Sequence, residues 1–135
     1  MNDKMRRAIG SALLLGTIGA AMLSIPAGVA AKDGDIIHRG NCSANSDWKL
    51  KLSPENGRIE VEFEVDQNRV GDAWRVRIRH DGDLVFAGRR ITRAPSGSFQ
   101  VRIVQGNRAG GDLFRGRAVN VRTGEVCDGR ATWAG

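Results

Sequence analysis

Two short stretches of the sequence alternate between apolar and charged residues almost without error. Residues 59–65 place a glutamate at every second position, and residues 74–79 place an arginine there. Strict alternation is typical of β-strands that have one face in a core and the other in water. The chain is therefore predicted to be an antiparallel β protein with a single core. The outward residues are Glu60, Glu62 and Glu64 on the first stretch and Arg75, Arg77 and Arg79 on the second.

The first 31 residues have the features of a secretory signal peptide. Three basic residues precede residues 8–25, which carry no charge, and Pro26 and several small residues follow. Cleavage is expected after Ala31, with Ala30 as the alternative. A membrane anchor is the other interpretation, because 18 uncharged residues can just span a bilayer. The many Gly, Ala, Ser and Thr residues and the helix-breaking proline favour the signal peptide.

The rest of the chain is long enough for one domain with a modest core. We expect residues 1–31 to be the signal peptide, 32–46 a leader segment that contains Cys42, and 47–135 a β-sandwich domain. Residues 1–31 hold three basic residues and one acidic residue, so the net charge falls from +6 to +4 when they are removed. The protein is expected to be secreted, either extracellular or in the cell envelope.

Two cysteines remain in the exported chain, Cys42 and Cys127. An oxidising compartment favours a disulfide between them. That bond would close a loop of about 85 residues, and the chain-entropy model gives it roughly 4 kcal/mol. The alternative, a redox or nucleophilic thiol, has little support because the chain has no Cys-x-x-Cys motif and His80 is the one candidate base in its main body.

Turn signals about every ten residues separate seven expected strands. Asn56-Gly57 and Asp81-Gly82 are strong hairpin signals. The strands are expected within residues 48–52, 59–65, 74–79, 84–92, 99–103, 114–121 and 126–133. The predicted core consists of Leu50, Leu52, Ile59, Val61, Phe63, Val65, Trp74, Val76, Ile78, Phe99, Val101, Ile103, Phe114 and Ala118.

Residues 112–120 resemble the penultimate strand of immunoglobulin-like and fibronectin-type domains. Those domains often have Asp-x-Tyr-x-Cys-x-Ala-x-Asn there, whereas this chain has Phe114 at the tyrosine position and Gly116 at the cysteine position. Trp74 lies where such domains place a core tryptophan, and Phe63 lies where the partner cysteine is expected. The resemblance implies an immunoglobulin-like antiparallel β-sandwich of about seven strands, with its first and last strands side by side.

The chain as a whole resembles small secreted actinobacterial proteins of unassigned function. The stretches that carry this resemblance are residues 48–53 and 93–99, together with the signal peptide and the two terminal cysteines. The resemblance implies a bacterial β-sandwich protein, and it implies no catalytic residue.

The arginine row at Arg75, Arg77 and Arg79 is the main candidate binding site. If residues 66–72 form a hairpin, these arginines pair with the glutamate row on a neighbouring strand. If residues 66–72 cross between sheets, the arginine row is open to an acidic partner. Arg90 and Arg102 are expected to extend the row into a patch, with Arg89 and Arg93 close by.

Enzymatic chemistry has little support in the sequence. His80 ends a hairpin strand, where a histidine is usually a surface or turn residue, and Asp81 and Asp83 flank the glycine of a turn. Ser96 lacks a Gly-x-Ser-x-Gly context. No group of His, Cys and carboxylate residues has the spacing of a metal site. We expect no enzymatic activity, no cofactor and no bound metal.

The expected function is a secreted, non-catalytic binding module that uses its arginine-rich sheet face. The partner would be an acidic protein or a cell-surface polymer, and the protein is expected to be a monomer with no membrane contact after signal cleavage. Nucleic acid is not expected, because the chain has few aromatic residues and most of them point toward the core. The alternative is an inhibitor of a secreted enzyme that presents a loop. The candidate loops are 66–72, 93–97 and 106–111.

Overall fold

The computed structural model of the protein describes residues 31–134. The predicted signal peptide lies outside these residues apart from Ala31. Within them the chain forms eight strands and no helix, and so no helix there is long and apolar enough to cross a membrane. The strands are β1 (Ile36–Asn41), β2 (Asp47–Glu55), β3 (Arg58–Asp66), β4 (Ala73–His80), β5 (Asp83–Ile91), β6 (Ser98–Gly106), β7 (Gly111–Asn120) and β8 (Val126–Ala134).

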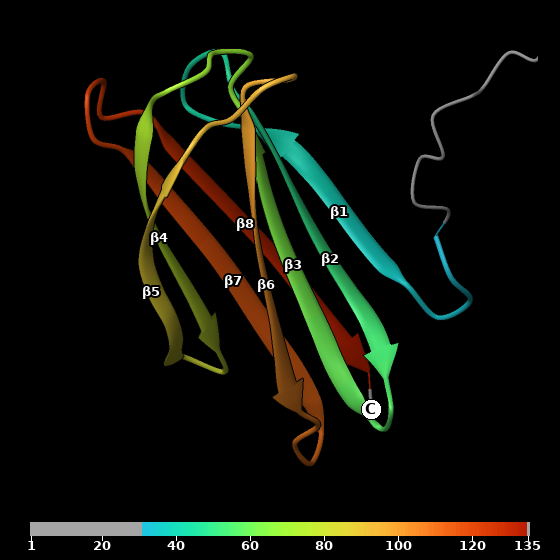
Figure 1. Cartoon of the computed structure of the whole chain (residues 1–135). Coiled ribbons are helices and arrows are strands. Elements are labelled where there is room, and N and C mark those ends of the chain that lie inside the picture. The colour runs from blue at the N-terminus through green and yellow to red at the C-terminus, as the bar shows by residue number, and fades with distance from the viewer. Residues whose placement is uncertain (1–30, 135) are drawn as a thin grey trace, which may run out of the picture. The chain divides into compact units, whose positions relative to one another are not determined.

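The strands form two antiparallel four-stranded sheets that pack as a sandwich, which confirms the predicted fold class (Figure 1). The first sheet has the order β1-β2-β3-β6, and the second has the order β5-β4-β7-β8. Residues 67–72, between β3 and β4, therefore cross from the first sheet to the second. The two predicted hairpin turns are present, with Asn56 and Gly57 at φ 50° and 76° and Asp81 and Gly82 at φ 48° and 88°. Positive φ at both central residues is the geometry of a type I′ turn.

The core lies between the two sheets, as the alternating strands predict. All the predicted core residues are buried except Ile103, which is only partly buried against the core. Ile103 lies on β6, an edge strand of the first sheet. Phe99 and Val101 of the same strand are buried, so the partial exposure is confined to its C-terminal half, where Val104 and Gln105 are also partly exposed. Cys42, Cys127 and Ala131 complete the buried cluster.

The segment expected as a leader contains a strand of the sandwich. Residues 36–41 form β1, which pairs with β2 in an antiparallel register from Ile36 opposite Leu52 to Asn41 opposite Asp47. The sequence of β1, Ile-Ile-His-Arg-Gly-Asn, does not alternate, so its pattern gave no strand signal. The first sheet therefore begins before residue 47.

The predicted disulfide between Cys42 and Cys127 is present. Cys42 directly follows β1, an edge strand of the first sheet, and Cys127 lies on β8, an edge strand of the second. Beside the disulfide, the Ser43 amide donates to the Val126 carbonyl at 2.8 Å, and the Val126 amide donates to Ser43 Oγ at 2.8 Å. The first and last strands thus lie side by side, and the disulfide closes that side of the sandwich.

Candidate functional site

The glutamate and arginine rows lie in different sheets. The glutamate strand β3 pairs with β2 and β6, whereas the arginine strand β4 pairs with β5 and β7. Because residues 67–72 cross between the sheets, the two rows face away from each other. This arrangement decides between the two alternatives that the sequence left open.

The outer face of the first sheet is a ladder of ion pairs. Lys49 Nζ lies 3.1 Å from the Glu64 carboxylate, and Lys51 Nζ lies 3.2 Å from the Glu62 carboxylate. The Arg102 guanidinium donates to Glu60, and this hydrogen bond lowers the pKa of the Glu60 carboxyl. Each glutamate of the row thus has a cation from β2 or β6, and the charge of this face is largely balanced.

Two of the five predicted binding residues lie away from the arginine row. Arg102 is on β6 in the first sheet, where it pairs with Glu60. Arg90 lies on β5, directly opposite the inward-facing Trp74 of β4. The Arg90 guanidinium lies 5.0 Å from the centre of the Phe86 ring. Alternation along β5 therefore directs Arg90 to the opposite side of the sheet from Arg75, Arg77 and Arg79.

The outer face of the second sheet collects arginines from all four of its strands. One row across the strands holds Arg79, Arg115 and Arg130, and the next holds Arg77, Arg117 and Asp128. A third row holds Arg89 next to Arg75. We call this surface the arginine face. Its seven arginines are Arg75, Arg77, Arg79, Arg89, Arg115, Arg117 and Arg130.

Asp128 is the one acidic strand residue on this face within residues 31–134. Its carboxylate accepts from both Nε and Nη2 of Arg115, with 3.0 Å between Nε and Oδ1, and lies 3.7 Å from Nη1 of Arg117. The hydrogen bonds from Arg115 and the charges of nearby arginines lower the pKa of Asp128. Asp128 therefore stays ionised at neutral pH, holds two guanidinium groups in place and leaves most of the positive charge uncompensated.

The middle of the arginine face is hollowed. Arg77, Arg79, Arg115 and Arg117 line a hollow of about 220 Å³. Arg77 is directly opposite Arg117 in the register, and Arg79 is directly opposite Arg115. The sequence predicted the β4 half of this hollow from alternation. It missed the β7 half, although Arg115 and Arg117 also occupy alternate positions in the sequence.

A buried histidine network lies at the turn that joins β4 and β5. His80 is 1% exposed, whereas the sequence predicted a surface or turn residue. Its Nε2 is 2.6 Å from Oδ1 of the fully buried Asp112, and its ring stacks on Phe114 at 4.2 Å. Asp112 Oδ1 also accepts from the Arg108 amide at 3.0 Å. Sequence spacing could not reveal this pair, because Asp112 follows His80 by 32 residues.

His80, Asp81 and Asp112 place three potential metal-ligand atoms within 4.8 Å of one another. The sequence predicted no such cluster, because only the first two residues are adjacent in the chain. The His80 Nε2 atom is already hydrogen-bonded to Asp112, and both of these side chains are buried. A ligand would have to break that bond to enter, so the contacts describe a structural network that anchors the turn.

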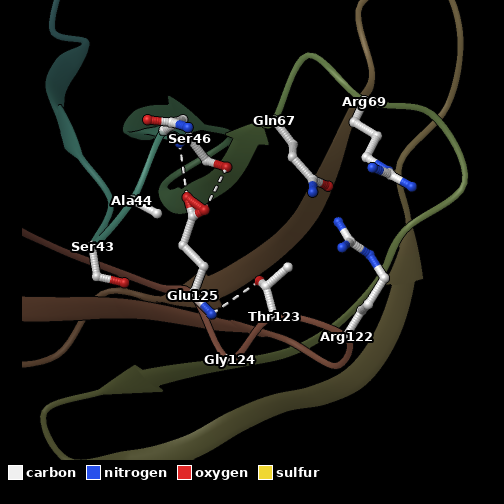
Figure 2. A pocket seen from close by; sticks show the side chains of 10 residues that line it. Ser43, Ala44, Ser46, Gln67, Arg69, Arg122, Thr123, Gly124 and Glu125 are labelled. Carbon is white, nitrogen blue, oxygen red and sulfur yellow. Dashed lines mark hydrogen bonds between the residues drawn. The ribbon is translucent and has the colours of Figure 1, made fainter.

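A pocket of about 400 Å³ opens at the end of the sandwich formed by the loops 42–46, 67–72 and 121–125 (Figure 2). Its carboxylate, Glu125, accepts from the Ser46 amide at 2.8 Å and from Ser46 Oγ at 3.0 Å. Its arginines, Arg69 and Arg122, contact Asp72 at 3.4 Å and 2.7 Å. The charged groups of this pocket are therefore already paired within the protein.

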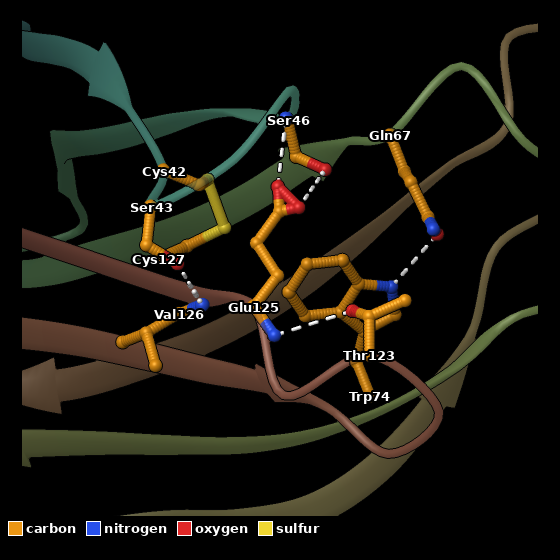
Figure 3. Close-up of a disulfide and its surroundings, with 9 residues drawn as sticks. All are labelled: Cys42, Ser43, Ser46, Gln67, Trp74, Thr123, Glu125, Val126 and Cys127. Atoms are coloured by element: carbon orange, nitrogen blue, oxygen red, sulfur yellow. Dashed lines mark hydrogen bonds between the residues drawn. A yellow bond between two sulfur atoms is a disulfide. The ribbon is translucent and has the colours of Figure 1, made fainter.

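The same loops hold that end of the sandwich together. The Trp74 indole donates to Gln67 Oε1 at 3.0 Å, and the Ser46–Glu125 bonds lie in the surroundings of the disulfide (Figure 3). Of the three candidate loops, 66–72 lines part of this pocket and carries the chain from the first sheet to the second. The 93–97 loop folds back on itself, since the Gly97 amide donates to the Arg93 carbonyl at 2.8 Å.

Comparisons of the chain with protein-family models, with curated proteins and with solved structures give no match. The resemblance to small secreted actinobacterial proteins therefore stays a prediction. The candidate site rests on the geometry and charge of the arginine face.

Proposed function

We propose that the protein is a secreted, non-catalytic binding module whose arginine face binds an anionic polymer at the cell surface. The observation that carries the proposal is the difference between the two outer faces of the sandwich. Ion pairs balance the first sheet, whereas seven arginines and one aspartate share the second.

Arginine suits this role because its guanidinium keeps its charge and forms paired hydrogen bonds with carboxylate or phosphate oxygens. A face lined by one sign of charge also attracts a polyanion from a distance and raises its local concentration. The charged rows run across neighbouring strands of one sheet, and this gives a long polymer several contacts at once.

Secretion rests on the N-terminal sequence and is supported by the Cys42–Cys127 disulfide. Structural disulfides persist in oxidising compartments and are rare in the cytosol. A binding role without catalysis is proposed because the guanidinium groups stay protonated and serve as neither general base nor nucleophile, and the one strand carboxylate of the face, Asp128, is held by Arg115.

The proposal is tested by measuring how the oxidised protein binds immobilised polyphosphate and polyglutamate over a range of salt concentrations. The variant Arg75→Gln/Arg77→Gln/Arg79→Gln removes three charges from the face. The control Lys32→Gln/Arg39→Gln/Arg58→Gln removes three exposed basic residues from other parts of the molecule. We expect the first variant to bind at least ~10-fold more weakly and with a shallower salt dependence, and the control to change little.

Equal losses in the two variants would contradict the proposal, because only net charge would then matter. Failure of the wild-type protein to bind either polymer, together with capture of a soluble acidic protein, would replace the polymer with a protein partner. Inhibition of a secreted protease that is lost on Arg93→Gln would favour the inhibitor alternative instead. The contacts within the 93–97 loop give that alternative no added support.

A further inference from the structure

The four arginines of the central hollow form an arrangement that is unfavourable without an anion. Arg77 is directly opposite Arg117, and Arg79 is directly opposite Arg115. Side chains at directly opposite positions of an antiparallel pair are close neighbours, and like charges there destabilise the pair. The polar face of the first sheet avoids this problem, since Lys49 is opposite Glu64 and Lys51 is opposite Glu62.

The hollow is also partly preorganised. Asp128 fixes the Arg115 guanidinium through two hydrogen bonds and attracts Arg117 at 3.7 Å. Arg79 Nη1 donates to the Gly82 carbonyl at 3.1 Å, which restrains a third guanidinium. Arg77 is exposed and completes the lining. Restrained guanidinium groups lose less conformational freedom when they bind an anion.

The size and charge of the hollow indicate the kind of anion. A volume of about 220 Å³ exceeds that of several waters, at about 30 Å³ each. Four arginines line the hollow, and Asp128 supplies one negative charge beside them. A carboxylate brings one charge and two oxygens. A phosphate monoester carries about −1.5 to −2 charges at pH 7 and three strong acceptor oxygens, and so it matches four arginines better.

We infer that the hollow lined by Arg77, Arg79, Arg115 and Arg117 is a discrete site for a phosphate group, either free or carried by a polymer. This inference rests on the proposed function and narrows it, since it names the anion that the arginine face prefers. The remaining arginines of the face then contribute to long-range attraction, and the hollow contributes selectivity for phosphate over carboxylate.

The test compares two double variants that remove the same charge from the same face. Arg77→Gln/Arg117→Gln removes one opposed pair from the hollow, whereas Arg75→Gln/Arg89→Gln removes a neighbouring pair outside it. Binding of inorganic phosphate, tripolyphosphate and acetate is measured by calorimetry at constant ionic strength. Thermal unfolding without ligand shows that each variant folds.

We expect the wild-type protein to bind phosphate and tripolyphosphate in preference to acetate. The hollow variant should lose at least ~10-fold in phosphate affinity, and the outer variant less than ~3-fold. Because phosphate also stabilises folded proteins by exclusion from their surfaces, a rise in Tm that is equal in all variants does not indicate a site. Without ligand, the hollow variant should unfold at the same temperature as the wild type or higher, since it loses like-charge repulsion.

Each of four outcomes overturns the inference. Equal losses in the two double variants mean a diffuse cationic surface without a discrete site. Equal affinity for acetate and phosphate means that the hollow does not select phosphate. If the protein binds a polyanionic polymer but neither phosphate nor tripolyphosphate, this inference is contradicted and the proposed function stands. If it binds neither the polymer nor phosphate, the inference and the proposed function are both contradicted. Tighter binding of tripolyphosphate than of free phosphate per phosphate group, at constant ionic strength, would identify a polymer as the source of the group.

Discussion

Phe63 and Gly116 show how single residues set the spacing of the two sheets. They occupy the positions where the immunoglobulin-like resemblance places the inter-sheet cysteines. A Cβ at residue 116 would lie 2.7 Å from atoms of the Phe63 ring, so the ring packs directly against the glycine backbone. Aromatic packing thus joins the two sheets at the centre of the sandwich, and the disulfide of this protein lies at its side.

Gly116→Ala should therefore destabilise the fold. The added methyl group overpacks a buried site, and overpacking typically costs about 1–3 kcal/mol. Urea unfolding measures the change. Gly106→Ala is the matched control, because residue 106 is also a strand glycine and a Cβ there meets nothing within 4 Å. A control loss as large as that of Gly116→Ala would contradict the assignment of the effect to Phe63.

Asp72 should make the stability of the protein depend on pH. A hydrogen bond from Arg122, followed by one from Gln67, holds the pKa of this carboxyl well below its usual range. Because the folded-state pKa is depressed, the stabilisation is complete above the unfolded-state pKa of about 3.9 and is lost as the pH falls through the folded-state value.

The stability difference between the wild-type protein and Asp72→Asn should therefore shrink as the pH is lowered from about 5 toward 2. Urea unfolding at a series of pH values measures it. Asp33→Asn serves as a control at an exposed aspartate, and its difference from the wild type should stay small throughout. A difference for Asp72→Asn that does not change with pH would show that the Arg122 contact does not form.

Strands differed in how well the sequence predicted them. Alternation predicted β3, β4 and β6 and their inward residues, because a strand with one buried face needs no knowledge of its neighbours. The edge strand β1 lacked that pattern and was missed. The pairing of the charged rows was not predictable either, since residues 67–72 suit a hairpin or a crossover equally well. The partners of Glu60 and Arg77 depend on that choice.

The disulfide between the β1 and β8 edges should carry much of the stability. Its cysteines are 85 residues apart, and loss of a native disulfide from a small secreted domain typically costs about 2–5 kcal/mol. Cys42→Ala/Cys127→Ala should unfold at a correspondingly lower guanidinium concentration. Reductant should lower the unfolding midpoint of the wild-type protein and leave that of the double variant unchanged. A double variant as stable as the oxidised protein would contradict this role.

At the scale of the whole molecule, the two outer faces of one sandwich differ in charge. The first sheet pairs its charges within itself, and the second carries seven arginines beside one aspartate. Two arginine faces repel each other, which fits the expectation of a monomer. The sequence predicted the β4 part of the arginine face and the nearby Arg89 of β5. The contributions of β7 and β8 depend on strand order, which local patterns do not encode.

The most direct test of the arginine face is a ¹H–¹⁵N NMR titration of the oxidised protein with polyphosphate. We predict that the perturbed amides cluster on β4 and β7, with smaller changes on β5 and β8, and that residues of β2 and β3 keep their chemical shifts. Shifts that concentrate on β2, β3 and β6, or that spread evenly over both sheets, would contradict the assignment of polyanion binding to the arginine face.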